Sequence, residues 1–242
     1  MSARTVPALV EVLAHLEAAA TPKDLANLRR FGIAATRPLG VSMVHVQRIA
    51  RDAGRNHALA AALWDSGIYE ARLMAAYVDE PARVTVAQMD RWARDFDNWG
   101  VCDTLCFALF DRTPHAWRCV DRWASARPEF VRRAAFALMA SLAVHDKVAP
   151  DAPFLERLPL IESAADDSRD LVRKGVSWAL RTTGRRSAAL HRASLDVATR
   201  LAASADPGAR WVGKDALRDL RGPIAMRVVA KRAVSKRAGK KR

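Results

Sequence analysis

The segment 95–106, with the sequence DFDNWGVCDTLC, places an aromatic ring and a carboxylate four residues apart. A helix is expected to begin near Asn98, and Trp99 and Asp103 then project from the same face. The residues after Asp103 are mostly apolar, so this carboxylate is an exception on a helix of core character. A fixed carboxylate can stabilise positive charge that builds in a transition state and can orient an attacking water molecule. It can also pair with a neighbouring arginine or cap a turn, and composition alone favours these structural roles.

A second aromatic candidate is Trp178, which lies in the segment VRKGVSWALRTT with Arg181 three residues later. On a helix the two side chains share a face. Aromatic rings attract cationic bases through cation–π interaction, so two such rings would suit a cationic substrate. Tryptophan in a helix is usually buried. Of the other tryptophans, three are expected in the core (Trp92, Trp117 and Trp123) and two are undecided (Trp64 and Trp211).

The three cysteines, Cys102, Cys106 and Cys119, are interpreted as thiols that pack as small hydrophobic side chains. Cys102 and Cys106 lie four residues apart, a spacing that could support a metal ion. No His and no second cysteine pair accompanies them at ligand spacing. The sequence therefore predicts neither a metal nor a cofactor.

The chain is strongly basic, with 40 Lys and Arg against 26 Asp and Glu and a net charge of +14 over 242 residues. Residues 227–242 hold eight basic residues and no acidic one, and without them the charge is still +6. Such a balance indicates a polyanionic partner, with nucleic acid first among the candidates. The alternative is a solvated basic tail with no specific partner.

Helix-favouring residues dominate, alternating β-branched runs are missing, and Pro and Gly fall between periodic segments. Five segments resemble one another and begin at Tyr69, Val101, Val131, Val172 and Ala209, spaced by roughly 30 to 40 residues. This period is typical of helical repeats. The predicted fold is all-α, an α-solenoid of HEAT- or armadillo-like repeats.

In a stacked array the first turns of these helices would line one concave surface. Basic residues recur there, and they would make the surface a basic groove that follows a duplex backbone without reading its sequence: Arg72, Arg133, Arg173 or Lys174, and Arg210. Residues 1–226 are expected to form one repeat domain, and residues 227–242 a basic tail with disorder from about Ser235. No signal peptide or membrane span is evident, so the chain is expected in the bacterial cytoplasm.

With these residues in place, the chain resembles the DNA alkylation-repair family of HEAT-like-repeat glycosylases, the AlkD type. The resemblance extends from about Leu28 to Leu220. Its strongest segments are LWDSGIYEARLMAAYV (63–78), QMDRWARDFDNWGVCD (88–103), FVRRAAFALM (130–139) and VRKGVSWALR (172–181). Members carry residues that match Trp99 and Asp103, a phosphate-binding arginine that matches Arg133, and a Trp and Arg three apart that match Trp178 and Arg181.

The resemblance implies a monomeric, monofunctional glycosylase that acts on cationic N3- and N7-alkylated purines in double-stranded DNA. Such an enzyme leaves an abasic site, needs no metal, and does not flip the damaged nucleotide. Asp103 would stabilise the sugar cation and position water, while Trp99 and Trp178 would pack on the deoxyribose and backbone. Arg133 and Arg181 would hold phosphates, with Arg173 and Lys174 as further DNA-binding candidates.

Two positions depart from the family pattern. Members often carry a polar residue near Met43 that helps to hold DNA, and a thioether cannot donate a hydrogen bond. Ser42 or backbone amides would have to serve instead. Gly100 stands where an acidic residue can occur, so Asp103 is the only carboxylate of that pair.

Two other functions fit an α-solenoid, because the fold alone decides neither. A non-catalytic protein could bind distorted DNA, and Asp103 would then be consumed in a salt bridge. A protein-interaction scaffold would instead present an apolar or acidic concave face, which the basic first-turn residues argue against.

Overall fold

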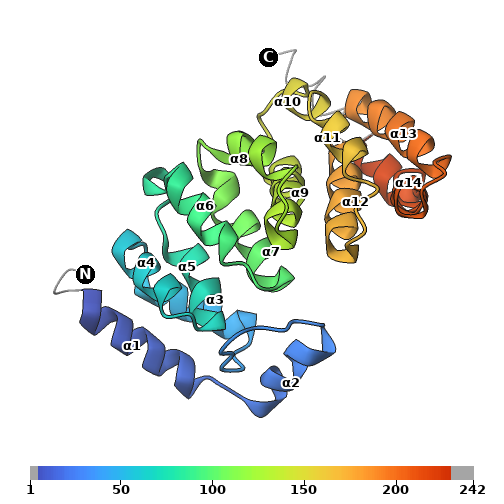
Figure 1. Cartoon of the computed structure of the whole chain (residues 1–242). Helices are drawn as coiled ribbons and strands as arrows, with labels where there is room; N and C mark the ends of the chain where they lie inside the picture. The colour runs from blue at the N-terminus through green and yellow to red at the C-terminus, as the bar shows by residue number, and fades with distance from the viewer. Residues whose placement is uncertain (1–4, 230–242) are drawn as a thin grey trace. The chain divides into compact units, whose positions relative to one another are not determined.

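The computed structural model describes residues 5–229 and is built from helices (Figure 1). The predicted all-α class is confirmed, since no strand occurs in that range. The chain divides into two compact units, Met1–Ala116 and Trp117–Arg242, so the single repeat domain predicted for residues 1–226 covers the first unit and most of the second. Residues 223–229 are helical, and the rest of the predicted tail, including Ser235, lies outside the described residues. In the described range, no helix is long and apolar enough to cross a membrane.

The first unit is organised around α5, which packs against α3, α4 and α7, while α1 packs against α3 and α4. Its elements are α1 (Thr5–Ala18), α2 (Pro22–Arg30), α3 (Met43–Ala53), α4 (His57–Asp65), α5 (Tyr69–Val78), η1 (Pro81–Arg83), α6 (Val86–Arg94), α7 (Trp99–Ala108) and η2 (Phe110–Arg112). The core includes a stacked pair, Trp64 and Trp92, whose ring centroids are 4.4 Å apart. Both rings are buried, which confirms the core prediction for Trp92 and resolves Trp64.

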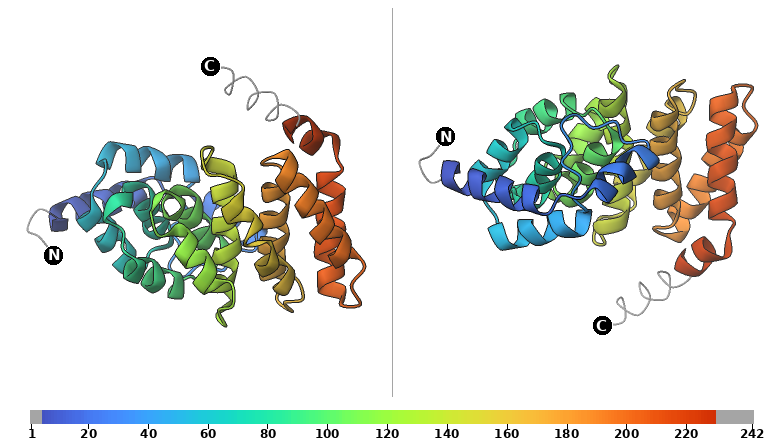
Figure 2. Two further views of the ribbon diagram at one scale, coloured as in Figure 1. Left: turned by 90° about the horizontal axis from the view of Figure 1, so that it is seen from above. Right: turned by 90° about the horizontal axis from the view of Figure 1, so that it is seen from below.

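The second unit is organised around α12, which packs against α9, α11, α13 and α14. Its elements are α8 (Ala116–Trp123), α9 (Glu129–His145), α10 (Ala152–Leu155), α11 (Leu158–Ser163), α12 (Asp170–Gly184), α13 (Ala188–Ala202) and α14 (Pro207–Leu220). The orange to red helices α12, α13 and α14 lie together in Figures 1 and 2. Trp123 is buried as predicted, whereas Trp117 is half-buried beneath Arg157 and Trp211 is 41 % exposed.

The five similar segments are confirmed as helices. Four of them share an arginine hydrogen bond to the main chain that precedes the helix. The fourth residue of α5, α9, α12 and α14 is an arginine that donates to a main-chain carbonyl five to eight residues earlier. These turn arginines are Arg72, Arg132, Arg173 and Arg210. Their acceptors lie in the last turn of the preceding helix or in the connection that follows it, where carbonyl groups lack helical partners.

The bonds differ in length but follow one pattern. Arg132 Nε lies 2.9 Å from the carbonyl oxygen of Ala124, and Arg210 Nη1 lies 2.8 Å from that of Ser204. Arg72 Nε approaches the Trp64 carbonyl at 3.5 Å, and its guanidinium also covers the Trp64 ring. The turn arginines therefore stabilise the junctions between helices, a role that the sequence interpretation had not given to Arg72, Arg173 and Arg210.

Replacing Arg210 by Gln is expected to lower the free energy of unfolding by about 1 to 2 kcal/mol, because the Ser204 and Ala205 carbonyls lose a charged donor. Chemical denaturation would measure the change. Arg192→Gln removes an equal charge from the exposed surface of α13 and is the matched control. Equal stability of the two variants would show that this turn arginine has no structural role.

Candidate active site

Helix α7 exposes one narrow stripe to solvent. Its half-buried residues are Trp99, Asp103, Thr104 and Phe107, here called the α7 stripe, and the other residues of the helix are buried. Their spacing of four, five and eight residues places them on one face. As predicted, Trp99 and Asp103 lie on the same, partly accessible face of α7. Asp103 is the stripe's only ionisable side chain.

The start of α7 is fastened to the chain that follows α2. The Trp99 indole N–H donates to the Phe31 carbonyl at 3.2 Å, which fixes the ring. Asp97 Oδ2 accepts the backbone N–H of Thr36 at 3.1 Å. Asn98 caps the helix by accepting the Val101 N–H at 3.0 Å, as its residue type predicts. The Trp99 ring is thus held in place before any ligand binds.

Gly100 allows α7 to approach α5 closely. A Cβ atom at this position would lie 2.7 Å from the Tyr69 hydroxyl and 3.4 Å from an Ile33 methyl carbon. An acidic side chain, which can occur here in the resembled family, would require the buried Tyr69 side chain to shift. Burial, and then the charges of Glu70 and Asp97, raise the pKa of Tyr69 above its usual range, so its hydroxyl stays protonated.

A buried carboxylate shapes the loop before α3. Glu70 accepts three backbone N–H groups, from Leu39 at 2.8 Å, Gly40 at 2.8 Å and Val41 at 3.1 Å. The side chain is fully buried, and carboxylates that accept several main-chain donors hold a loop firmly. This contact sets the position of the next residues, Ser42 and Met43.

Ser42 and Met43 already have partners, although the helix end beside them keeps donors. Ser42 is the N-cap of α3, and the Met43 sulfur accepts the Tyr77 hydroxyl at 3.9 Å. No hydrogen bond within residues 5–229 engages the backbone N–H of Met43 or Val44. The N-terminus of α3 therefore keeps two amide donors available for an anion.

The cysteines of α7 lie on its buried face. All three cysteines of the chain are buried thiols, as interpreted from the sequence. Burial, followed by interaction with Cys102 and Asp103, raises the pKa of Cys106 well above its usual range. Residues 5–229 contain no cluster of three or more His, Cys, Asp or Glu side chains suited to a metal ion.

In the second unit, α12 also presents a face with accessible side chains. Lys174 is exposed, and Trp178 and Arg181 are half-buried, while the helix residues between them are buried. These three residues, here called the α12 stripe, follow one another at spacings of four and three. The predicted pairing of Trp178 with Arg181 on one face is present.

Arg133 is more enclosed than a surface phosphate ligand would be. It is 7 % exposed, and its Nη1 donates to the Leu171 carbonyl at 2.6 Å in the first turn of α12. A Cβ atom on Gly175 would lie 3.5 Å from Arg133 Cγ, so the glycine makes room for the arginine stem. Arg133 thus joins α9 to α12, and the phosphate-binding role expected of it would come in addition to this structural contact.

The other predicted DNA-binding cations have ionic or carbonyl partners. Arg181 pairs with Asp215 at 3.5 Å and lies 4.0 Å from Asp219, both in α14. Lys174 pairs with Asp170 at 2.7 Å in an exposed contact, and Arg173 is a turn arginine. Exposed ion pairs contribute little stability, so Lys174 could leave Asp170 and bind a phosphate at little cost in free energy.

A buried ion cluster stabilises the turn before α12. The Asp167 side chain is 2 % exposed and pairs with Arg169 at 2.6 Å and Arg132 at 2.8 Å. The Arg169 hydrogen bonds, with further help from Arg132, lower the pKa of Asp167 below its ordinary value. A lowered folded-state pKa adds stability above about pH 4, and this contribution disappears as pH falls through the lowered value.

Replacing Asp167 by Asn should therefore destabilise the protein by about 2 kcal/mol at neutral pH. The gap between wild type and variant should shrink below about pH 4, as the wild-type carboxyl also becomes neutral. Denaturation curves at a series of pH values would measure both effects. A gap that stays constant down to pH 2 would exclude the charged pair as its cause.

Some of these features were not anticipated from the sequence. Neither Glu70 nor the bonds from Trp99 and Asp97 to residues 31–36 had a local signal, because their partners lie far along the chain. The turn arginines did have one, since an arginine recurs at the fourth residue of four repeated helices. That recurrence predicts a charged surface, and it equally fits a repeated contact to the preceding turn.

Comparison with known proteins adds two findings. The sequence model of a family described as "DNA alkylation repair enzyme" matches residues 12–220. A solved structure from "a new family of proteins related to the HEAT-like repeat DNA glycosylases with affinity for branched DNA structures" is similar, with a TM-score of 0.72 and 17 % identity over 87 % of this chain and 94 % of that one. The likeness confirms the predicted HEAT-like repeat fold.

A designed armadillo repeat protein is also similar over 74 % of this chain and 94 % of its own, with 13 % identity and a TM-score of 0.34. No curated protein matches the sequence at a significant level.

Proposed function

This chain belongs to the DNA alkylation repair enzyme family, and from that premise we propose that it is a monofunctional DNA glycosylase. Its substrates are double-stranded DNA segments that carry N3- or N7-alkylated purines, and its product is an abasic site. The observation that carries the proposal is the α7 stripe, where Asp103 is the single carboxylate on the accessible face of an otherwise buried helix.

Asp103 supplies the electrostatic part of the reaction. When the bond between the purine and C1′ of deoxyribose breaks, its electron pair leaves with the base and positive charge develops on the sugar, as in glycoside hydrolysis. A carboxylate fixed beside that sugar stabilises the charge. It also orients the water molecule that attacks C1′, and the proton released from that water passes to solvent.

The proposed substrates are cationic purines because such bases can leave without a general acid. An N7- or N3-alkylated purine is already cationic, so it becomes neutral as it accepts the electron pair of the breaking bond. It therefore leaves without protonation by the enzyme. In this proposal Trp99 packs on the deoxyribose, and Trp178 in the second unit is a candidate for contact with the DNA backbone. The lesion stays in the duplex rather than entering a pocket.

Phosphate contacts hold the damaged strand. The candidates are the cations Arg133, Arg173, Lys174 and Arg181, and the N-terminus of α3 at Ser42 and Met43. The amides of Met43 and Val44 support the last of these, because helix N-termini bind phosphate through unpaired N–H groups. The net charge of +14 supports affinity for a polyanion independent of sequence.

A second function also has an observation in its favour. The similar solved structure comes from a family described as having affinity for branched DNA. The second function is recognition of distorted DNA by this chain without cleavage of a glycosidic bond. In that case Asp103 serves only its intramolecular contacts. The two functions differ in one product, the released base.

The test compares two lesions in otherwise identical duplexes, 7-methylguanine as a cationic base and hypoxanthine as a neutral one. The proposal predicts release of 7-methylguanine with an abasic site left in the strand, and little or no release of hypoxanthine. Release of both at similar rates would point to an enzyme that protonates its leaving group. Tight binding of branched DNA with no base release would favour the second function.

A further inference from the structure

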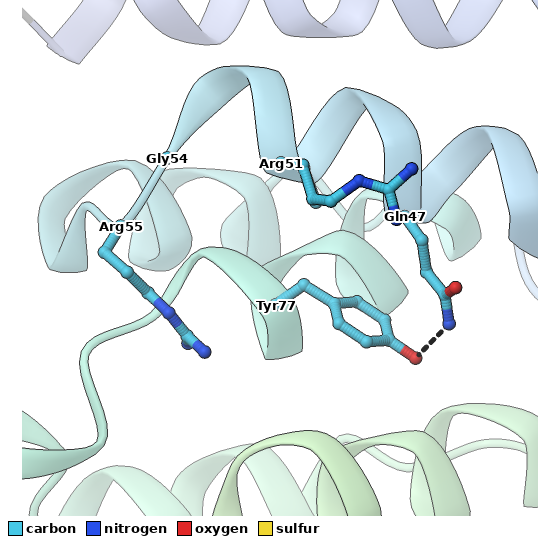
Figure 3. A pocket seen from close by; sticks show the side chains of 6 residues that line it. Gln47, Arg51, Gly54, Arg55 and Tyr77 are labelled. Carbon is cyan, nitrogen blue, oxygen red and sulfur yellow. Dashed lines mark hydrogen bonds between the residues drawn. The ribbon is translucent and has the colours of Figure 1, made fainter.

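The first unit contains a cavity between the end of α3 and α5, and its lining is rich in donors. The cavity measures about 430 Å³ and is lined by Gln47, Ala50, Arg51, Gly54, Arg55 and Tyr77. This volume falls in the range of roughly 300 to 1,000 Å³ that is common for small-ligand sites. Figure 3 shows both arginine side chains extending from the end of α3, with the Tyr77 hydroxyl directed toward Gln47.

The two arginines differ in how they are held. Arg55 donates from Nη1 to the Asp79 main-chain carbonyl, so its guanidinium is oriented and keeps further N–H groups. No hydrogen bond or ion pair within residues 5–229 engages the Arg51 side chain. The Asp79 carboxylate bonds to His57 at 2.6 Å and to Gln88 at 2.7 Å, and within residues 5–229 it makes no ion pair with Arg51 or Arg55.

The rest of the lining is arranged in advance. Gln47 Nε2 donates to the Tyr77 hydroxyl at 3.0 Å, and that hydroxyl donates to the Met43 sulfur. Gly54 ends α3 with φ of +69°, a value that L side chains rarely adopt, and this turn sends Arg55 back toward the cavity. Two guanidinium groups beside an aromatic ring form a lining that favours an anion attached to a larger organic group.

We propose that this α3–α5 cavity binds a phosphate group, with Arg51 and Arg55 as its ligands and Tyr77 against the attached nucleoside or sugar. Guanidinium groups match the geometry of phosphate oxygens and donate charge-assisted hydrogen bonds. Two sources share this chemistry: a phosphodiester of a nucleic acid strand and the phosphate of a free nucleotide. The first source would extend the proposed function by adding a strand contact remote from the α7 stripe, and the second is independent of it.

The first measurement is a titration of the full-length protein with inorganic phosphate and with a nucleoside 5′-monophosphate. NMR spectra of the arginine Nε–H groups report binding at Arg51 and Arg55. The proposal predicts that both resonances shift, and that Arg51→Gln weakens binding about tenfold. Arg51 is exposed and makes no contact that this change would break, so the variant should fold. Unmoved resonances at millimolar phosphate would overturn the proposal.

The second measurement separates the two sources. DNA affinity is followed against salt concentration for Arg51→Gln/Arg55→Gln and for the control Arg29→Gln/Arg48→Gln, which removes the same charge from exposed positions outside the cavity. If DNA occupies the cavity, the slope of log affinity against log salt concentration should become shallower in the cavity variant than in the control. The expected difference is about one unit for each lost phosphate contact.

Equal salt dependence in both pairs, with nucleotide binding lost only in the cavity variant, would assign the cavity to a free phosphate ester. Equal nucleotide binding in both pairs would overturn the site itself. Base release plays no part in these readouts, so failure of the glycosylase proposal would leave this test intact.

Discussion

Asp103→Asn is expected to slow the release of 7-methylguanine by a factor of about 100 to 1,000. This is the size of effect found when one electrostatic stabiliser of a transition state is removed. The amide keeps the shape of the carboxylate but cannot balance the sugar cation. Affinity for the same duplex should stay equal or rise, because a negative charge leaves a DNA-binding surface. Single-turnover kinetics at saturating protein separate the two effects.

Asp65→Asn is the matched control for this change. Asp65 is an exposed carboxylate in the same unit, and its partner is Arg91 at the surface. The control should release base at the wild-type rate. If Asp103→Asn also did so, or if it lost rate only through a loss of stability, the catalytic role proposed for Asp103 would be contradicted.

Glu70→Gln is expected to lower the free energy of unfolding by about 3 kcal/mol, the largest change in stability predicted for a single side chain here. The wild-type carboxylate accepts the N–H groups of Leu39, Gly40 and Val41 in a buried setting. An amide presents one oxygen as acceptor and turns its own donors toward backbone donors, so at least one buried N–H is left unsatisfied.

The same substitution should loosen the loop that carries Ser42 and Met43, and thus weaken DNA binding, although the loss of a negative charge by itself would favour binding. Glu156→Gln changes an exposed carboxylate and should leave both stability and affinity near the wild-type values. Chemical denaturation and duplex titration of the two variants provide the comparison. A loss of less than 1 kcal/mol in Glu70→Gln would show that the loop does not depend on this carboxylate.

The sequence predicts the helices well because their signals are local. Thr21 before Pro22, and Asp206 before Pro207, each accept a backbone N–H three residues later, as their residue types indicate. The repeated segments are all helical, and Trp99 and Asp103 share a face because four residues make about one turn. These features require only the order of neighbouring residues.

The roles of individual charges are much harder to predict, because they depend on partners far along the chain. Arg181 meets carboxylates of α14, and Arg133 meets a carbonyl of α12. Either residue type would look the same in sequence if it faced a phosphate. Glu70 similarly resembles an ordinary acidic residue in a first helical turn, although its three acceptor contacts span about 30 residues.

The α3–α5 cavity is lined by residues of α3, of the turn after it and of α5, and no sequence motif predicts that they lie together. Arg51 and Arg55 are ordinary basic residues near a helix end, and Tyr77 is an aromatic residue in an apolar helix. Only the packing of α3 on α5 brings them around one space. A sequence pattern gives each residue its helix face, and tertiary packing decides which faces meet.

The most direct test of the central proposal is the release of 7-methylguanine by the wild-type protein from a duplex that holds one such lesion, under single-turnover conditions. The account predicts that the base is freed and that an abasic site remains in an otherwise intact strand. No release at saturating protein, with the duplex fully bound, would contradict the assignment of a glycosylase to the α7 stripe.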